Sequence, residues 1–196
     1  DAVRMAAEIG YPVAVKIDSP DITHKTEVGG VYLGVRDSGE LVAAYNQVTE
    51  SVARNAPEAK INGVLIQEMV KDSLELIVGM HRDPQFGPVI LCGLGGVLTE
   101  LLNDVSMRLC PLDSLDVEDM LSELKGSRLL QGFRGGVARD IKAVGDALVR
   151  LSELSGDFPD EIESIDINPL AVFAEGRGVK ALDALVVLRQ SPEKLS

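Results

Sequence analysis

The chain has 196 residues, of which 45% are hydrophobic and 26% are charged, and its formal net charge is −12. This composition excludes a disordered chain, and the acidic balance argues against nucleic acid or an anionic membrane as a partner. Two cysteines, Cys92 and Cys110, predict neither a zinc site nor a disulfide framework, so we expect a reducing, cytoplasmic location.

The first half of the chain alternates predicted helices with predicted strands. Apolar residues at helical spacing predict a helix over residues 2–9, and Gly10 stands where a helix C-cap is expected. Short runs rich in β-branched residues predict strands, and one longer amphipathic stretch predicts a second helix. The strands are expected at residues 12–17, 31–35, 61–70, 74–80 and 88–92, and the second helix at residues 40–56.

The second half continues this mixture and completes the predicted fold class. Helices are expected at residues 116–125 and 140–155, and strands at residues 164–167, 170–174 and 179–188, with a break at Asn168-Pro169. Strands joined by turns, with helices between them, predict an α+β fold of two lobes rather than one doubly wound sheet. We expect an N-terminal lobe of residues 1–70 and a C-terminal lobe of residues 71–196.

A lysine and a histidine stand out in the N-terminal lobe. Lys16 lies late in a predicted buried strand, and a polar loop containing His24 and Gly29-Gly30 follows. A buried ammonium group needs an anion, which could be a phosphate; the alternative is an edge strand with Lys16 in water. His24 could be a nucleophile, a base or a ligand, or a solvated loop residue. The two glycines could admit an anion or form an ordinary turn.

A glycine-rich stretch and an arginine form a second candidate group. Residues 93–96 follow a strand and could cradle a phosphate at a helix start, although they match neither the dinucleotide nor the P-loop pattern. A tight turn is the alternative. Arg108 lies among apolar residues and also requires an anion, either a ligand or a structural partner.

Three oxygen-bearing side chains in the C-terminal lobe suggest a metal site. Alternation along a strand places Asp166 and Asn168 on one face, and Asp183 lies inside another predicted apolar strand. Each could be structural by itself. Together they favour Mg²⁺, which takes one or two carboxylates plus nucleotide phosphates.

Several long motifs, in order, resemble one known family. The segment GYPVAVKIDSPDITHKTEVGGV is similar to the opening of the ATP-grasp domain of ADP-forming acyl-CoA synthetases such as acetate–CoA ligase. The segments VLIQEMV, LLQGFRG, DFPDEIESIDINPL and LDALVVL follow in the family's order. The resemblance runs from residue 10 to residue 188. It implies an ATP-grasp fold, in which two lobes grip a nucleotide, with an N-terminal element of the first lobe absent.

The resemblance also implies roles for individual residues. Lys16 would hold nucleotide phosphates and Glu75 the ribose hydroxyls, and His24 would carry phosphate on its way to ADP. Asn168 and Asp183 would bind Mg²⁺, with Asp166 nearby. The hinge around adenine would be Gln67, Glu68, Met69 and Val70, and the residues that organise the phosphates would be Arg108 and Glu100.

The implied reaction is ATP + carboxylic acid + CoA ⇌ ADP + phosphate + acyl-CoA. Its cofactors would be ATP/ADP and Mg²⁺. The CoA-binding and ligase domains would be the partner, either in the same polypeptide or in an alpha subunit. The alternative is a regulatory nucleotide-binding module of a synthetase-like protein acetyltransferase that lacks ligase activity.

Overall fold

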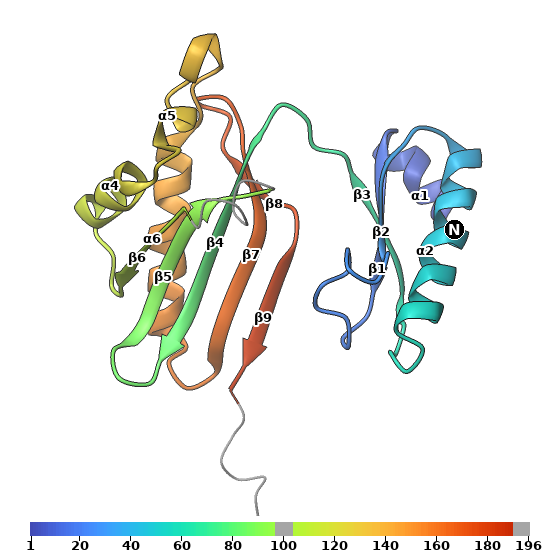
Figure 1. Ribbon diagram of the computed structural model, residues 1–196, viewed down its shortest axis with the longest axis horizontal. Coiled ribbons are helices and arrows are strands. Elements are labelled where there is room, and N and C mark those ends of the chain that lie inside the picture. Colours follow the sequence, from blue (N-terminus) through green and yellow to red (C-terminus); the bar gives the residue numbers. More distant parts are fainter. Residues whose placement is uncertain (97–103, 190–196) are drawn as a thin grey trace, which may run out of the picture. The chain divides into compact units, whose positions relative to one another are not determined.

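The computed structural model describes residues 1–96 and 104–189 and divides the chain into two compact units, Asp1–Lys71 and Asp72–Ser196 (Figure 1). Each unit has its own antiparallel sheet and its own apolar core. The α+β fold class is therefore confirmed.

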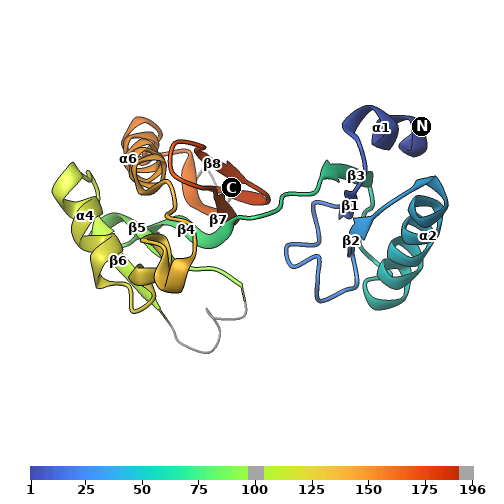
Figure 2. The ribbon, with the colours of Figure 1, turned by 90° about the horizontal axis from the view of Figure 1, so that it is seen from above.

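The first unit is a three-stranded sheet with two helices. Its strand order is β2-β1-β3, so β1 is hydrogen-bonded on both sides. The helices lie on one side of the sheet (Figure 2) and cover the alternate residues Val13, Val15 and Ile17, all of which are buried. The elements are α1 (Ala2–Ile9), β1 (Val13–Asp18), β2 (Val31–Val35), α2 (Ser38–Asn55) and β3 (Gly63–Glu68).

Helix α2 shows how local sequence sets an element. The carboxylate of Asp37 accepts a hydrogen bond from the backbone N–H of Glu40 at 2.9 Å, which is an N-cap. The helix therefore begins at Ser38, two residues earlier than its apolar pattern predicted. Its buried residues recur at three- and four-residue intervals and face β1; they are Leu41, Ala44, Val48 and Val52.

The second unit is a larger antiparallel sheet. Its order is β6-β5-β4-β7-β8, and β9 also pairs with β7. The strands are β4 (Leu74–Asp83), β5 (Gly87–Leu94), β6 (Val105–Leu109), β7 (Ile162–Val172), β8 (Val179–Ala181) and β9 (Ala184–Leu188).

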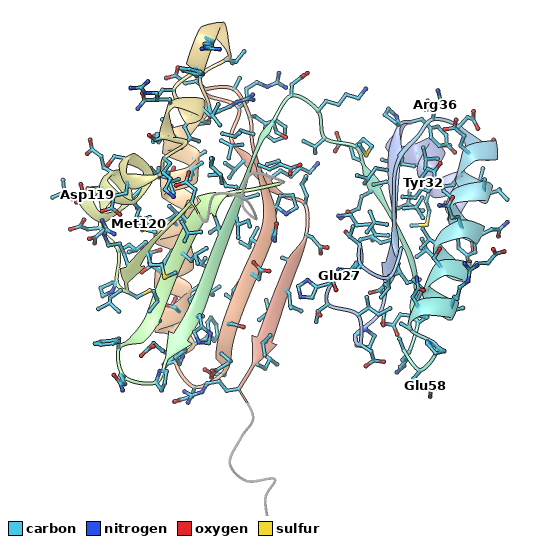
Figure 3. All side chains as sticks on the ribbon, in the orientation of Figure 1. Glu27, Tyr32, Arg36, Glu58, Asp119 and Met120 are labelled. Carbon is cyan, nitrogen blue, oxygen red and sulfur yellow. The ribbon has the colours of Figure 1, made fainter. Side chains whose placement is uncertain are left out.

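Helices cover one face of this second sheet. They are α4 (Ser114–Glu123), α5 (Ser127–Leu130) and α6 (Ile141–Asp157), with a 3-10 turn at Phe133–Gly135. Helix α6 runs behind the strands in Figure 1. In α4, Met120 is fully buried in the core whereas its neighbour Asp119 is exposed (Figure 3). Within residues 1–96 and 104–189, no helix is both long and apolar enough to cross a membrane.

The structure corrects two predicted strand boundaries. The predicted break at Asn168-Pro169 is wrong, because β7 runs through it with a register shift against β4. The predicted single strand 179–188 is instead two strands, separated at Leu182-Asp183. The two places face each other: the Pro169 carbonyl accepts from the Leu182 N–H at 3.0 Å, and the Asn168 N–H donates to the Asp183 carbonyl at 3.1 Å. Pro169 itself has no N–H to donate to this pairing.

Candidate functional site

Lys16 lies on the central strand of the first unit. The residues on either side of it face the helices, so alternation places Lys16 on the opposite side of the sheet, which we call the far face of the first sheet. The side chain is half-buried. The edge-strand alternative is wrong, because β1 pairs with both β2 and β3.

The predicted adenine hinge begins on the same far face. Gln67 pairs with Ala14, and Leu65 pairs directly with Lys16, so Gln67 and Lys16 lie on one face two positions apart. Glu68 ends β3 opposite Val13, on the helix side of the strand. Met69 and Val70 follow the strand, and the Met69 N–H donates to the Pro12 carbonyl at 3.3 Å.

His24 lies on an anchored loop between β1 and β2. Ile22 is buried in the core of the first unit, and Val28 packs against that core. Between these anchors, His24 is exposed, and its carbonyl accepts from the N–H of Glu27, labelled in Figure 3, at 3.2 Å. The structure therefore holds the loop at both ends and presents the imidazole outside the core.

The two glycines that close this loop are structural. Gly29 has a φ of 70°, and a Cβ on Gly30 would lie 2.7 Å from Ile17 Cγ2. The Gly30 N–H donates to the backbone carbonyl of Lys25 at 2.7 Å, and the Gly30 carbonyl accepts from the backbone N–H of Ile17 at 2.7 Å. These groups serve the loop itself, so the turn interpretation is the one that the geometry supports.

The glycine-rich end of β5 packs against β4 in the second unit. The Gly95 N–H donates to the Glu75 carbonyl at 2.7 Å, and a Cβ on Gly95 would meet that carbonyl oxygen at 2.9 Å. The Glu75 carboxylate is exposed, and its Oε2 lies 3.6 Å from the point that a Cβ on Gly96 would occupy. Glu75 and this glycine stretch are thus neighbours. Glu100, in contrast, lies outside the described residues.

Arg108 has a protein partner. It pairs with the buried Ile90, which places it on the helix-covered face of the second sheet. Its Nη1 donates to Glu123 Oε2 at 3.0 Å and its Nη2 to Glu123 Oε1 at 2.5 Å. Arg108 and the Ser106 hydroxyl together hold the pKa of Glu123 down to about 2. The anion that the sequence required is therefore Glu123, and the structure does not bring Arg108 together with Asp166 and Asn168.

The three predicted metal ligands lie on β7 and on the connection that pairs with it. Asp166 and Asn168 are exposed on the far face of the second sheet, the face opposite α4 and α6. Asp183 lies in the connection between β8 and β9, not inside a strand, and its carbonyl accepts the Asn168 N–H at 3.1 Å.

This donor set suits one kind of metal site. Among the described residues no cluster of three or more His, Cys, Asp or Glu side chains could hold a metal. The two carboxylates and one amide of Asp166, Asn168 and Asp183 would by themselves supply only part of an oxygen shell. Such a shell fits Mg²⁺ shared with substrate phosphates better than a cation held by protein alone.

Sequence reasoning missed Asp140, which ties helix α6 to the β7–β8 hairpin. Its buried carboxylate accepts from the N–H groups of Ala143 at 3.1 Å and Gly178 at 2.8 Å. These backbone hydrogen bonds, Gly178 first, lower its pKa. An aspartate directly before an apolar helix is an N-cap signal, so half of this role was visible in the sequence; the contact with Gly178 was not.

The comparisons with known proteins identify the family of the chain. The family model of the ATP-grasp domain matches residues 1–188. The chain belongs to the ATP-grasp family, in the group formed by the ATP-grasp domains of ADP-forming acetyl-CoA synthetases. The predicted resemblance is thereby confirmed.

Three relatives illustrate the match. The chain is 40% identical over 189 residues to the beta subunit of acetate–CoA ligase (ADP-forming) II of Pyrococcus furiosus. This match covers 96% of the chain and 80% of that subunit. The chain is 46% identical over 179 residues to acetate–CoA ligase (ADP-forming) I of Archaeoglobus fulgidus. This second match covers 91% of the chain and 26% of that protein. The chain thus spans about a quarter of one relative and four fifths of the other.

The third relative has been solved with ligands. It is the dinucleotide-forming acetyl-coenzyme A synthetase 1 of Ca. Korarchaeum cryptofilum, in complex with coenzyme A, Ca-AMPCP and HgCl⁺. The match has a TM-score of 0.89 and 45% identity, and covers 96% of this chain and 81% of that one. Another structure of that synthetase contains Mg-AMPPCP and has its phosphohistidine segment pointing towards the nucleotide binding site (TM-score 0.79, 41% identity, 96% and 81% covered).

Proposed function

We propose that the chain is the nucleotide-binding part of an ADP-forming acyl-CoA synthetase, which interconverts ATP, a carboxylic acid and CoA with ADP, phosphate and acyl-CoA. The observation that carries the proposal is the Asn168–Asp183 backbone hydrogen bond beside Asp166. It puts two of the proposed Mg²⁺ ligands opposite each other in a chain of this family, and their side-chain oxygens are of the kind that a nucleotide-bound Mg²⁺ takes.

The first unit supplies the groups for phosphates and base. Lys16 would neutralise phosphate charge from the far face of the first sheet. The base edge would be recognised at the end of β3 by backbone groups of Gln67, Glu68, Met69 and Val70. Placing and neutralising the phosphates is most of what a protein contributes to phosphoryl transfer.

His24 would carry the phosphoryl group. A nitrogen lone pair of the neutral imidazole forms a bond to phosphorus as the bond from phosphorus to the departing ADP oxygen breaks. The phosphoryl group would then pass to a histidine of the ligase portion, as the bond from phosphorus to His24 breaks, and from that histidine to the carboxylic acid. CoA would displace phosphate from the resulting acyl phosphate. The Korarchaeum synthetase has a phosphohistidine segment, which supports a relay through phosphohistidine in a relative of this chain.

The second unit supplies the metal and ribose groups. Asn168 and Asp183 would hold Mg²⁺, with Asp166 beside them, and Glu75 would contact the ribose. When bound, Mg²⁺ neutralises charge on the transferring phosphates. Glu100 is retained as a predicted organising residue, whereas Arg108 is left out because Glu123 already satisfies its guanidinium.

The partner in this proposal is the CoA-binding and ligase portion, either fused or in a separate alpha subunit. The relatives include both a beta subunit and a much longer single chain. They are ligases and synthetases, so they do not support the regulatory acetyltransferase alternative. A cytoplasmic location is also proposed, on the two free cysteines, Cys92 and Cys110.

The chain offers a matched test, because it contains only 2 histidines. In the enzyme assembled with its ligase portion, His24→Ala should lower acyl-CoA synthesis by about 10³-fold or more, since the phosphoryl carrier is lost. The dissociation constant of Mg-ATP should stay within about twofold. His81→Ala, at an exposed position of β4, is the control and should retain activity. Normal synthesis by His24→Ala would overturn the proposed relay.

A further inference from the structure

The segment that leads out of the first unit is tied at both of its ends. Met69 is held within the first unit by its hydrogen bond to Pro12. Asp72 begins the second unit, and its carbonyl accepts a hydrogen bond from Arg139 Nη1 at 2.5 Å. Only Val70 and Lys71 lie between these two tied residues. We call Met69–Asp72 the linker.

Asp72 has an unusual backbone conformation. Its φ is 57°, in the left-handed region, which aspartate adopts more readily than most residues that have a Cβ. The hydrogen bond from Arg139 holds the carbonyl group of this turn, and it is strengthened because the donor carries a positive charge.

Arg139 is itself fixed by its neighbours in the fold. Its N–H donates to the Leu130 carbonyl at 2.8 Å, and its backbone bridges to Ala174 beyond β7. The next residue, Asp140, donates its N–H to Phe173 at 3.0 Å and caps helix α6. The backbone that carries the Arg139 side chain is therefore held by three separate parts of the second unit.

We propose that Arg139 is a positioning residue for recognition of the nucleotide base. This inference rests on the proposed function, in which backbone groups at Met69 and Val70 meet the base edge. By fixing the Asp72 carbonyl and its left-handed turn, Arg139 sets the direction in which the peptide groups of the linker point. Recognition by backbone groups depends on this direction, because displacement by about an ångström is enough to lose a hydrogen bond. Arg139 acts through the linker and does not need to touch the nucleotide.

The test compares a ligand that has a base with one that has none. With the whole chain and Mg²⁺, Arg139→Met should weaken ATP binding about tenfold by calorimetry, whereas binding of inorganic tripolyphosphate should be unchanged. Arg139→Lys retains a charged donor and should recover part of the lost affinity. Arg128→Met is the matched control, because Arg128 is an exposed arginine on α5, and it should bind both ligands like the wild type.

A kinetic version uses the enzyme assembled with its ligase portion. Arg139→Met should raise KM for ATP about tenfold while kcat and the KM values for CoA and the acid stay within about twofold. Equal weakening of ATP and tripolyphosphate, or no change in either, would overturn the positioning role. If Arg139→Met does not fold, Arg139→Lys carries the same comparison with a smaller expected shift. Failure of the wild type to bind ATP would overturn the proposed function instead.

Discussion

Strands β1 and β6 each carry one basic residue among apolar neighbours, and the two residues have opposite surroundings. Lys16 of β1 lies on the far face of its sheet, away from the helices. Arg108 of β6 lies on the helix-covered face of its sheet and forms a two-pronged ion pair with Glu123. The sequence pattern is the same, a cation that needs an anion. The difference shows that one sequence pattern can place a cation on either face of a sheet: Arg108 lies on the covered face, where Glu123 binds it, and Lys16 lies on the far face.

The largest effect is expected at Lys16, where loss of activity without loss of stability would distinguish a phosphate-binding lysine from a structural one. In the assembled enzyme, Lys16→Met should reduce kcat/KM for ATP by about 10² to 10³-fold, because a phosphate loses its cation. Lys16→Arg should restore part of that activity. The melting temperature of Lys16→Met should stay close to that of the wild type, since the side chain is not part of the apolar core. Normal kinetics in Lys16→Met would remove the contrast with Arg108.

A smaller effect is expected at Asp140, which is structural. Asp140→Ala removes the N-cap of α6 and leaves the Gly178 N–H without its acceptor, so the melting temperature should fall by about 5 °C. Asp140→Asn keeps one acceptor oxygen and should lose less. Circular dichroism on heating measures both. An unchanged melting temperature in the alanine variant would show that the hairpin contact adds nothing.

Arg108→Met tests the second basic residue of the comparison, the one that Glu123 binds. Because the side chains of the pair are 26% and 51% exposed and water screens their charges, its loss should lower the melting temperature by no more than about 2 °C. The kinetic constants for ATP should match those of the wild type. Glu123→Gln is the matched partner variant and should behave alike. A large rise in KM for ATP in Arg108→Met alone would return Arg108 to the phosphate site.

The smallest effect is a dependence of stability on pH. The pKa of Glu123 is lowered from 4.5 to about 2 in the folded chain, so its stabilising contribution is present above about pH 4.5 and is lost as the pH falls through 2. The difference in melting temperature between wild type and Glu123→Gln should therefore shrink between pH 5 and pH 2. A difference that stays constant over this range would contradict the ion pair.

The sequence predicted the elements where one periodic pattern dominated. Helix α2 and strand β1 follow their apolar spacing, and the order of motifs indicated the ATP-grasp family. Alternation also showed that Asp166 and Asn168 share a face of β7. What alternation cannot show is which face the helices cover, because that depends on pairings between distant strands. For this reason Lys16 and Arg108 were given the same interpretation.

The position of Asp183 was missed for a related reason. The run Ala181-Leu-Asp-Ala-Leu-Val-Val-Leu188 contains neither glycine nor proline, so nothing in it predicts a break. The break lies opposite Asn168 and Pro169 of the neighbouring strand, and Pro169 has no N–H to donate there. In the same way, no local signal pairs Arg139 with Asp72, which are 67 positions apart.

The anchored loop limits how far the backbone of His24, the proposed phosphoryl carrier, can move. His24 is two residues from Ile22, whose side chain is buried in the core. Two extended residues span at most about 7 Å, so the backbone of His24 stays within that radius while Ile22 is seated. Extracting an isoleucine from a core costs about 1.5–3 kcal/mol. Delivery of phosphate over a longer distance therefore requires either that this side chain leave its pocket or that the acceptor be brought to the loop.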